Sequence, residues 1–299
     1  MSKPATWLLD HQASIFSQFG EDGVIEKILD TLPKRDNWCV EFGALDGKYL
    51  SNTRNLIENK GYFAVLIEAD RTHYKNLTKN YLNNSQVKII NKFVNFKEND
   101  NLDTILENTE TPLEFDFLSI DIDGNDYHVW KAINRYSPKV VCIEFNPTIP
   151  NEITFVQVAD PKINHGSSLT AMVKLGKEKG YELISVIGVN AIFTKEKYFP
   201  LFEIENNSQE NLRTDSSNIT HLFVGYDGTI FLRGQSILPW HAHIPIIQSK
   251  IQKLPRFLRK FPGNYNKIQL AIFGLYLITF YPSLFINALK RKYATRKGT

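Results

Sequence analysis

Two stretches of the sequence, WCVEFGALDG at residues 38–47 and FLSIDIDGND at residues 117–126, share one pattern: an apolar run that ends in acidic residues and glycine. Such a run is typical of a strand that is buried on both faces of a parallel sheet. The acids and glycines would then lie at the carboxyl edge of the sheet, where open α/β folds bind their ligands. We therefore expect the chemistry of this protein at that edge.

The pattern continues along the chain and predicts an α/β fold. Strands are expected over 38–42, 62–68, 87–94, 115–123 and 140–145, with helices over 24–32, 53–60, 71–82, 102–108 and 127–136 between them. This alternation predicts an open, mostly parallel sheet with helices on both faces, joined by right-handed crossovers. A helix capped by Ser167 or Ser168 leads into strands 181–187 and 191–194. Because only three residues separate these strands, they predict an antiparallel hairpin.

The two cysteines and the first residues indicate the compartment. Cys39 and Cys142 lie inside apolar runs, so we expect two reduced thiols in the core and no disulfide. The first twelve residues, MSKPATWLLDHQ, lack the apolar region of a signal peptide. Both observations predict a cytoplasmic protein, with a position at the inner face of the cytoplasmic membrane left open.

The last fifty residues differ in kind. The formal charge of +3 is a property of this tail, because Lys250 to Lys297 contains many basic residues and no acidic one. Residues 268–289 carry no charge, and basic residues flank them on both sides. We expect a helix, kinked at Pro282, that lies in or dips into an anionic membrane surface as a peripheral contact. Packing on the domain or on a partner subunit is the alternative.

The glycine turn after the first strand indicates a nucleoside ligand. Gly43 and Gly47 let backbone amides approach a ligand next to a helix start. Glu68, at the end of the second strand, is placed to accept both hydroxyls of a ribose, and Asn91 to touch the base. The turn lacks the GxGxxG and GK[ST] patterns, which disfavours a dinucleotide-dependent dehydrogenase and a P-loop enzyme.

Acidic residues at two neighbouring strand ends predict a metal site. We expect Asp121, Asp123, Glu144 and Asn146 to converge there, because adjacent strands lie about 4.8 Å apart. Hard oxygen ligands of this kind suit Mg²⁺ first, and Ca²⁺ or Mn²⁺ less well. The alternative is that Asp121 or Asp123 caps the next helix and hydrogen-bonds the cofactor, with no metal.

Six motifs together resemble the FkbM-type family of class I S-adenosylmethionine-dependent methyltransferases. They are, in chain order, SQFGEDG at 17–23, VEFGALDG at 40–47, LIEAD at 66–70, FLSIDIDGNDY at 117–127, VVCIEFNP at 140–147, and GSSL at 166–169 with GYELISVIGVNAIF at 180–193. The resemblance covers roughly residues 17–201. It implies a Rossmann-like, seven-stranded methyltransferase sheet that ends in the antiparallel hairpin, and transfer of a methyl group to oxygen on a saccharide or glycan-type acceptor.

The resemblance also implies roles for individual residues. The cofactor-binding set is Gln18, Glu41, Gly43, Ala44, Asp46, Gly47, Glu68, Asn91 and Asp121. Gln18, Glu21 and Asp22 are implied to close over the cofactor or the acceptor. The metal site is similar to that of divalent-metal-dependent sugar O-methyltransferases, in which the metal grips acceptor hydroxyls. Deprotonation of the acceptor needs a base, for which His165 is the first candidate and His128 the second. Asp121 is also a candidate catalytic residue.

We accordingly expect four parts: an N-terminal cap segment (1–37), the methyltransferase catalytic domain (38–202), a polar loop and hairpin extension (203–248) and the basic and apolar tail (249–299). The alternatives are an enzyme of the same fold with a lipid-linked or small-metabolite acceptor, and a non-catalytic, membrane-attached nucleoside-binding module. No nucleic-acid partner is indicated, because the positive charge lies in the tail without base-stacking motifs. A homo-oligomer is left open.

Overall fold

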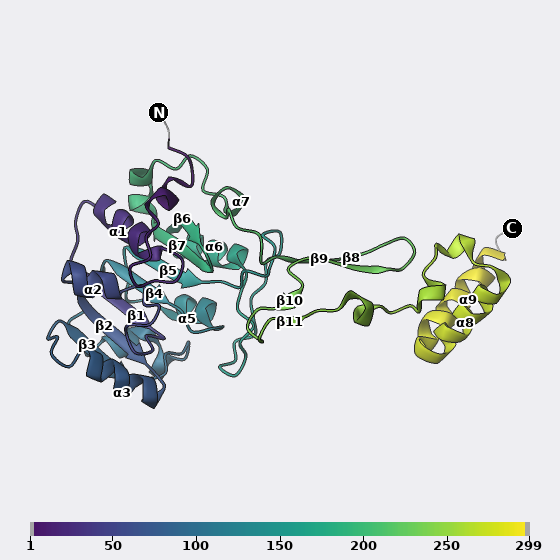
Figure 1. Cartoon of the computed structure of the whole chain (residues 1–299), viewed down its shortest axis with the longest axis horizontal. Helices are drawn as coiled ribbons and strands as arrows, with labels where there is room; N and C mark the ends of the chain where they lie inside the picture. The colour runs from purple at the N-terminus through teal and green to yellow at the C-terminus, as the bar shows by residue number, and fades with distance from the viewer. Residues whose placement is uncertain (1–2, 297–299) are drawn as a thin grey trace. The chain divides into compact units, whose positions relative to one another are not determined.

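The computed structural model describes residues 3–296, with side chains described as far as Lys290. The chain divides into two compact units (Figure 1), Met1–Asn218 and Ile219–Thr299, which we call the sheet unit and the tail unit. The four parts expected from the sequence stay a prediction, because a division into two units does not test their boundaries.

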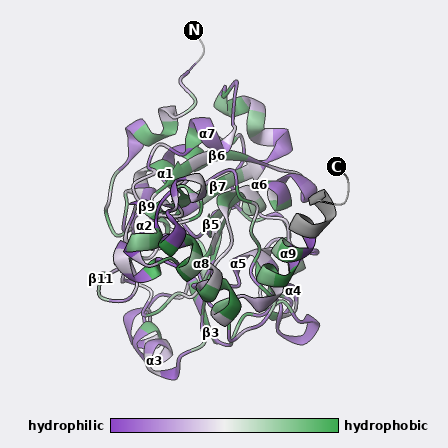
Figure 2. Cartoon of the chain, turned by 90° about the vertical axis from the view of Figure 1, so that its right-hand side faces the viewer, coloured by the Kyte–Doolittle hydropathy of each residue, from purple (hydrophilic) through white to green (hydrophobic). Residues whose placement is uncertain are grey.

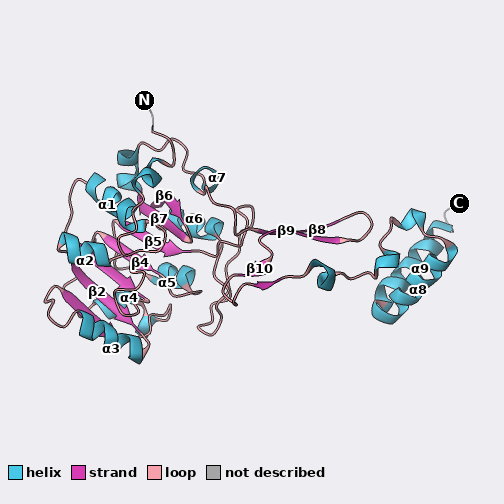
Figure 3. Cartoon of the chain, in the orientation of Figure 1, coloured by secondary structure: helices cyan, strands magenta, loops and turns pink. Residues whose placement is uncertain are grey.

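The sheet unit is built on a seven-stranded sheet (Figure 3) in the order β3-β2-β1-β4-β5-β7-β6. Its strands are β1 (Trp38–Phe42), β2 (Phe63–Glu68), β3 (Val87–Asn91), β4 (Phe117–Ile120), β5 (Val140–Glu144), β6 (Tyr181–Ile187) and β7 (Asn190–Lys195). All pairings from β3 to β5 are parallel, whereas β7 is antiparallel to both β5 and β6. The predicted Rossmann-like, seven-stranded sheet, mostly parallel with a C-terminal antiparallel hairpin, is confirmed.

Helices cover both faces of the sheet, because alternate residues of each strand point to opposite sides. The helices of the sheet unit are α1 (Glu21–Thr31), α2 (Arg54–Lys60), α3 (Arg71–Asn80), α4 (Leu102–Leu106), α5 (Asp126–Ala132), α6 (Leu169–Glu178) and α7 (Gln209–Leu212). Val40 and Phe42 of β1 belong to the core under α4, α5 and α6. Cys39 belongs to the opposite core, under α1, α2 and α3. Cys39 and Cys142 are buried free thiols, as expected.

Two strands end earlier than the sequence predicted. β3 ends at Asn91 instead of residue 94, and β4 ends at Ile120 instead of residue 123. The cause at β4 is Asp126, whose carboxylate accepts the amides of Ile122 and Gly124 at 2.9 Å each and so turns the chain. Asp121 and Asp123 therefore lie in a turn. Their side-chain directions do not follow the alternation between the two faces of the sheet that holds in a strand.

The tail unit contains two small hairpins and two helices. β8 (Thr220–Val224) pairs with β9 (Ile230–Gly234) through a turn that contains Asp227 and Gly228, and β10 (Ile237–Leu238) pairs with β11 (Ile244–Pro245). The single kinked helix expected over 268–289 is instead two helices, α8 (Lys267–Phe280) and α9 (Pro282–Arg296). The backbone breaks at Tyr281, since proline cannot continue a helix. Among the residues described, no helix combines the length and the apolar composition needed to cross a bilayer.

A buried ion pair supports the edge of the sheet opposite to the acids. Lys139 Nζ lies 2.7 Å from Asp116 Oδ1 and 2.7 Å from Asp36 Oδ2, and Asp116 also accepts the amides of Asp36 and Asn37. The side chains of Lys139 and Asp116 are 4% and 0% exposed. Removing one partner would leave the other charge buried without compensation, which is far more costly than losing an exposed pair.

We predict that Asp116→Ala lowers the free energy of unfolding by about 3–5 kcal/mol. The matched control is Asp30→Ala, which removes an ion pair of the same length, 2.7 Å to Arg35, between side chains that are 43% and 51% exposed. The control should lose less than about 1 kcal/mol, because water screens the exposed pair. Urea unfolding of both variants checks this. Equal losses would show that the buried pair does not support the fold.

Candidate active site

The carboxyl ends of β1 and β4 meet where the sheet changes its direction of winding. The chain runs outward from β1 to β2 and β3, then returns to β4 on the other side of β1. Open sheets bind ligands at such a switch point. Gly43, directly after β1, lies against the backbone of Asp121, directly after β4: a Cβ atom on Gly43 would be 2.0 Å from the Asp121 carbonyl oxygen. The two predicted halves of the site are therefore adjacent.

The glycine turn, residues 43–47, is tied to the end of β2. Glu68 Oε2 accepts the Leu45 amide at 2.8 Å, and Glu68 Oε1 accepts the Asp70 amide at 2.6 Å. Asn91 Nδ2 donates to the carbonyl oxygens of Glu68, at 2.7 Å, and of Ala69, at 3.2 Å. A carboxylate offers about four acceptor positions, so each Glu68 oxygen has capacity for one further hydrogen bond.

The other predicted cofactor residues of this region shape its backbone. Glu41 is buried and accepts the hydroxyls of Ser51 and Thr53 at 2.6 Å each. Desolvation raises the pKa of Glu41, although these hydrogen bonds oppose the rise. Asp46 accepts the amides of residues 48 and 49, and Ala44 donates its amide to the carbonyl of residue 67. A Cβ atom on Gly47 would overlap the side chains of residues 77 and 81.

Three carboxylates gather at the ends of β4 and β5. Asp121, Asp123 and Glu144, which we call the acid cluster, each offer an oxygen within 4.8 Å of the other two. Although Asp121 is exposed at the sheet edge, the surrounding protein displaces much of its water, and this desolvation, followed by the charge of Asp123, raises the pKa of Asp121 to about 6. Desolvation and the charge of Asp121 likewise raise the pKa of Glu144. This arrangement can hold a hard divalent cation.

Asn146, the fourth predicted metal ligand, is engaged elsewhere. Its Oδ1 accepts the amide and the hydroxyl of Thr148 at 2.9 and 2.7 Å, and its Nδ2 donates to the His165 carbonyl at 2.8 Å. The oxygen and the nitrogen of the Asn146 side chain thus both hold the long loop that follows β5. Its role as a metal ligand stays a prediction.

The two candidate bases are linked by Gln157, which sequence reasoning missed. His128 Nε2 lies 2.8 Å from the Gln157 carbonyl oxygen, while Gln157 Oε1 accepts the His165 amide at 2.8 Å. Gln157 is 2% exposed, whereas His165 is exposed. A lone glutamine in a polar loop gives no signal in a sequence, because its importance comes only from the groups that the fold brings to it.

The loop of residues 147–166 is anchored over this edge of the sheet. Arg213 donates to the carbonyls of Pro147 and Ile149 at 2.5 and 2.9 Å. Asn164 Nδ2 donates to the Asp123 carbonyl at 2.8 Å, and Asn125 Nδ2 donates to the Ile163 carbonyl at 3.2 Å. The loop therefore packs beside the acid cluster as an ordered wall of the site.

The N-terminal segment SQFGEDG is held in place by hydrogen bonds to two of its own acidic side chains. Asp22 Oδ2 accepts the amides of residues 15, 16 and 17, and Glu21 Oε1 accepts Asn190 Nδ2 at 2.9 Å. Glu21 and Asp22 are both buried, whereas Gln18 is exposed. The two acids fix the segment against the turn between β6 and β7, and Gln18 is the one of the three that solvent can reach.

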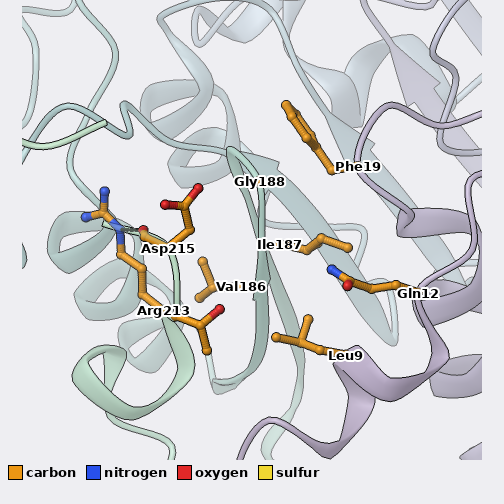
Figure 4. Close-up of a pocket in the computed structure, with 9 residues that line it drawn as sticks. Leu9, Gln12, Phe19, Val186, Ile187, Gly188, Arg213 and Asp215 are labelled. Atoms are coloured by element: carbon orange, nitrogen blue, oxygen red, sulfur yellow. Dashed lines mark hydrogen bonds between the residues drawn. The ribbon is translucent and has the colours of Figure 1, made fainter. Parts of the chain in front are cut away.

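A pocket of about 200 Å³ lies beside that turn (Figure 4). Its wall includes Phe19 from the N-terminal segment, Ile187 and Gly188 from the end of β6, and Arg213 and Asp215. The neighbouring residue of the turn, Asn190, pairs in register with Glu144 of the acid cluster. Sequence reasoning did not predict this pocket, because its walls come from segments at opposite ends of the sheet unit, from Leu9 to Asp215.

A comparison with protein-family models indicates the type of domain in part of the chain. Residues 97–183 match the family model described as the methyltransferase FkbM domain. The matched range contains the acid cluster, both candidate histidines and Gln157, while the glycine turn lies before it. No curated protein matches the sequence.

Solved structures resemble the chain at low identity. The N-terminal domain of EvdMO1, in the presence of SAH and D-fucose, is 9% identical with a TM-score of 0.38, over 58% of this chain and 82% of that one. A SAM-dependent methyltransferase from Aquifex aeolicus is 12% identical with a TM-score of 0.36, over 65% and 97%. The citrinin polyketide synthase CMeT domain is 13% identical with a TM-score of 0.38, over 58% and 50%. At these values their ligands carry no information about this chain.

We predict that Gly43→Ala destabilises the protein more than Gly61→Ala does. Both glycines have positive φ, +74° and +69°, but a Cβ atom at Gly61 meets nothing within 4 Å. The control should therefore lose only the conformational cost, about 1–2 kcal/mol, whereas Gly43→Ala must also push apart the ends of β1 and β4. Urea unfolding measures both losses. Equal losses would mean that the two strand ends are not in tight contact.

Proposed function

We propose that this chain, a methyltransferase that carries the FkbM domain in residues 97–183, uses S-adenosylmethionine to methylate a hydroxyl group of a saccharide or glycan-type acceptor, assisted by a divalent cation. The observation that carries the proposal is one of geometry: the glycine turn with Glu68 and the acid cluster meet at a single edge of the sheet, with Gly43 against Asp121. One side suits a nucleoside and the other suits a cation and hydroxyl groups.

Glu68 is the residue that we assign to the ribose of the cofactor. Its two oxygens are fixed by the Leu45 and Asp70 amides and retain acceptor capacity for two hydroxyls. S-adenosylmethionine supplies an electrophilic methyl group when bound. The protein must then align the acceptor oxygen with this group, and alignment alone lowers much of the barrier of such a displacement.

The acid cluster is the place that we assign to the cation. Asp121, Asp123 and Glu144 offer three hard oxygen ligands, and desolvation together with the neighbouring acids raises the pKa of Asp121 and of Glu144. A divalent cation there supplies Lewis acidity toward acceptor hydroxyls when bound.

Two histidines remain candidates for the base. A proton on His128 Nε2, donated to the Gln157 carbonyl, leaves Nδ1 as the nitrogen that can accept a proton. His165 is an exposed residue of the loop 147–166, and its backbone is fixed at both ends by Gln157 and Asn146. Both histidines stay candidates because a neutral imidazole keeps one ring nitrogen that can accept a proton.

The pocket beside the β6–β7 turn supports a saccharide acceptor. Sugars are bound by an aromatic surface together with planar polar side chains, and this pocket offers Phe19, Gln12 and Asp215. A lipid-linked or small-metabolite acceptor is the alternative, and a mass spectrum of the methylated product separates the classes. A cytoplasmic location and a homo-oligomeric state stay predictions from the sequence.

We predict that Glu68→Gln weakens binding of S-adenosylhomocysteine by about 10- to 100-fold, the loss expected for hydrogen bonds to a charged acceptor. The control is Glu58→Gln, which removes an acid paired with Arg54 on α2 and should leave the affinity unchanged. Titration calorimetry measures the affinities, and thermal unfolding verifies that both variants fold. Binding of NAD in place of S-adenosylhomocysteine by the wild type would contradict the proposed cofactor.

We predict that EDTA abolishes methyl transfer to a saccharide library and that added Mg²⁺ restores it. Asp123→Asn and Glu144→Gln should each weaken Mn²⁺ binding, followed by electron paramagnetic resonance, by about tenfold or more, because each removes one of three ligands. Asp30→Asn, an exposed acid on α1, is the control. Transfer that proceeds unchanged in EDTA would eliminate the metal and leave the cofactor assignment intact.

A further inference from the structure

The two units carry opposite charge. The tail unit contains twelve Lys and Arg residues and a single acid, Asp227, so its formal net charge is +11. The chain as a whole has a net charge of +3, which leaves −8 for residues 1–218. A positive field of this kind belongs to a surface that meets anions, and the sheet unit does not share it.

The helices α8 and α9 of the tail unit carry many exposed apolar side chains. The chain turns back at Tyr281, so that α9 runs alongside α8 as a helical hairpin (Figures 1 and 2). None of the residues of α8 is buried. In these two helices the large apolar side chains that are at least 42% exposed are Ile268, Leu270, Leu275, Ile278, Phe280, Leu284, Ile286 and Leu289. The described part of the chain leaves these side chains largely uncovered.

The distribution of these side chains excludes a helix that lies flat on a membrane. A surface helix of that kind needs one charged face, whereas α8 carries its single charge, Lys267, at its first residue. Figure 2 shows α8 as hydrophobic along most of its length. A helix that is apolar all round requires apolar surroundings on every side.

Basic residues lie at the end of the hairpin that is opposite to the turn at Tyr281. Lys267 begins α8, Lys290 follows the apolar part of α9, and both lie away from the turn at Tyr281. The basic segment 250–260 runs along the first part of α8, because Gln269 donates to the Phe257 carbonyl and the Tyr276 hydroxyl donates to the Lys253 carbonyl. Between Tyr276 and Lys290 all residues are apolar or uncharged, and we call residues 277–285 the apex.

We propose that the apex of this hairpin inserts into one leaflet of an anionic lipid bilayer while the basic segment 250–260 contacts the headgroups. The apex extends four residues of α8 beyond Tyr276, or about 6 Å at 1.5 Å per residue, which matches the usual depth of interfacial insertion, about 5–10 Å. Each Lys or Arg near an anionic surface strengthens the attachment. The hairpin thus enters and leaves the bilayer on one side.

The experiment is flotation of the full chain with vesicles, without cofactor or acceptor, so that its outcome is independent of the proposed methyl transfer. Vesicles of equal parts phosphatidylcholine and phosphatidylglycerol should bind the protein, and pure phosphatidylcholine vesicles should bind it much more weakly. Raising the salt concentration should weaken binding, because it screens the attraction of the basic segment.

Two matched variants locate the inserted part. Phe280→Glu places a charge in the apex at a side chain that is 64% exposed, and should lower the partition coefficient by about a hundredfold. Ile268→Glu makes the same change at a side chain that is 70% exposed beside Lys267, and should lower it by less than about tenfold. Unchanged affinity for S-adenosylhomocysteine or unchanged thermal unfolding of both variants verifies their folding.

Three results would overturn the proposal. The first is failure of the wild type to bind the anionic vesicles. The second is an equal loss in both variants, since that would place the whole hairpin, not its apex, at the surface. The third is a dimer in sedimentation experiments that Phe280→Glu dissociates while vesicle binding is absent, which would make a second copy of the chain the partner of the apolar surface.

Discussion

The contact of Gly43 with the carbonyl of Asp121 is the constraint on which the site depends. Any side chain at Gly43 would force the ends of β1 and β4 apart, because the obstacle is backbone and cannot move aside. This close approach brings the glycine turn, with Glu68 bonded to it, next to the first residue of the acid cluster. The proposed sites for the methyl donor and for the acceptor are therefore adjacent, because β1 and β4 are adjacent strands of the sheet.

Hydrogen bonds from buried polar side chains give this edge its shape. Asp126 ends β4 and turns Asp121 and Asp123 out of the strand, and Gln157 connects the two candidate histidines. Such groups are stabilising only when their partners are all in place, since a buried polar group without a partner is costly. The residues that contact ligands in the proposed reaction are thus held in place by other residues that make no contact with the ligands.

The tail unit differs from the sheet unit in the burial of its apolar side chains. In the sheet unit apolar side chains are buried in two cores, one on each face of the sheet. In α8 none is buried, although the helix is almost entirely apolar. An exposed apolar surface of this size is favourable only beside another apolar phase, and the basic residues around it indicate a surface that is negatively charged.

The fold class, the positions of the seven strands and the edge at which the acids collect could be predicted from the residue pattern, because alternation of buried strands with helices is a local property of the chain. The same pattern placed Gly43, Glu68, Asp121 and Glu144 at strand ends. Other features emerge only in the folded chain: β4 stops at Ile120, Asn146 is engaged by Thr148 and His165, and Gln157 joins the histidines. Another is that residues 268–289 form two helices. These features depend on hydrogen bonds and contacts between segments distant in sequence, or on the exact point where a helix breaks. The spacing of apolar residues along the sequence reveals neither of these.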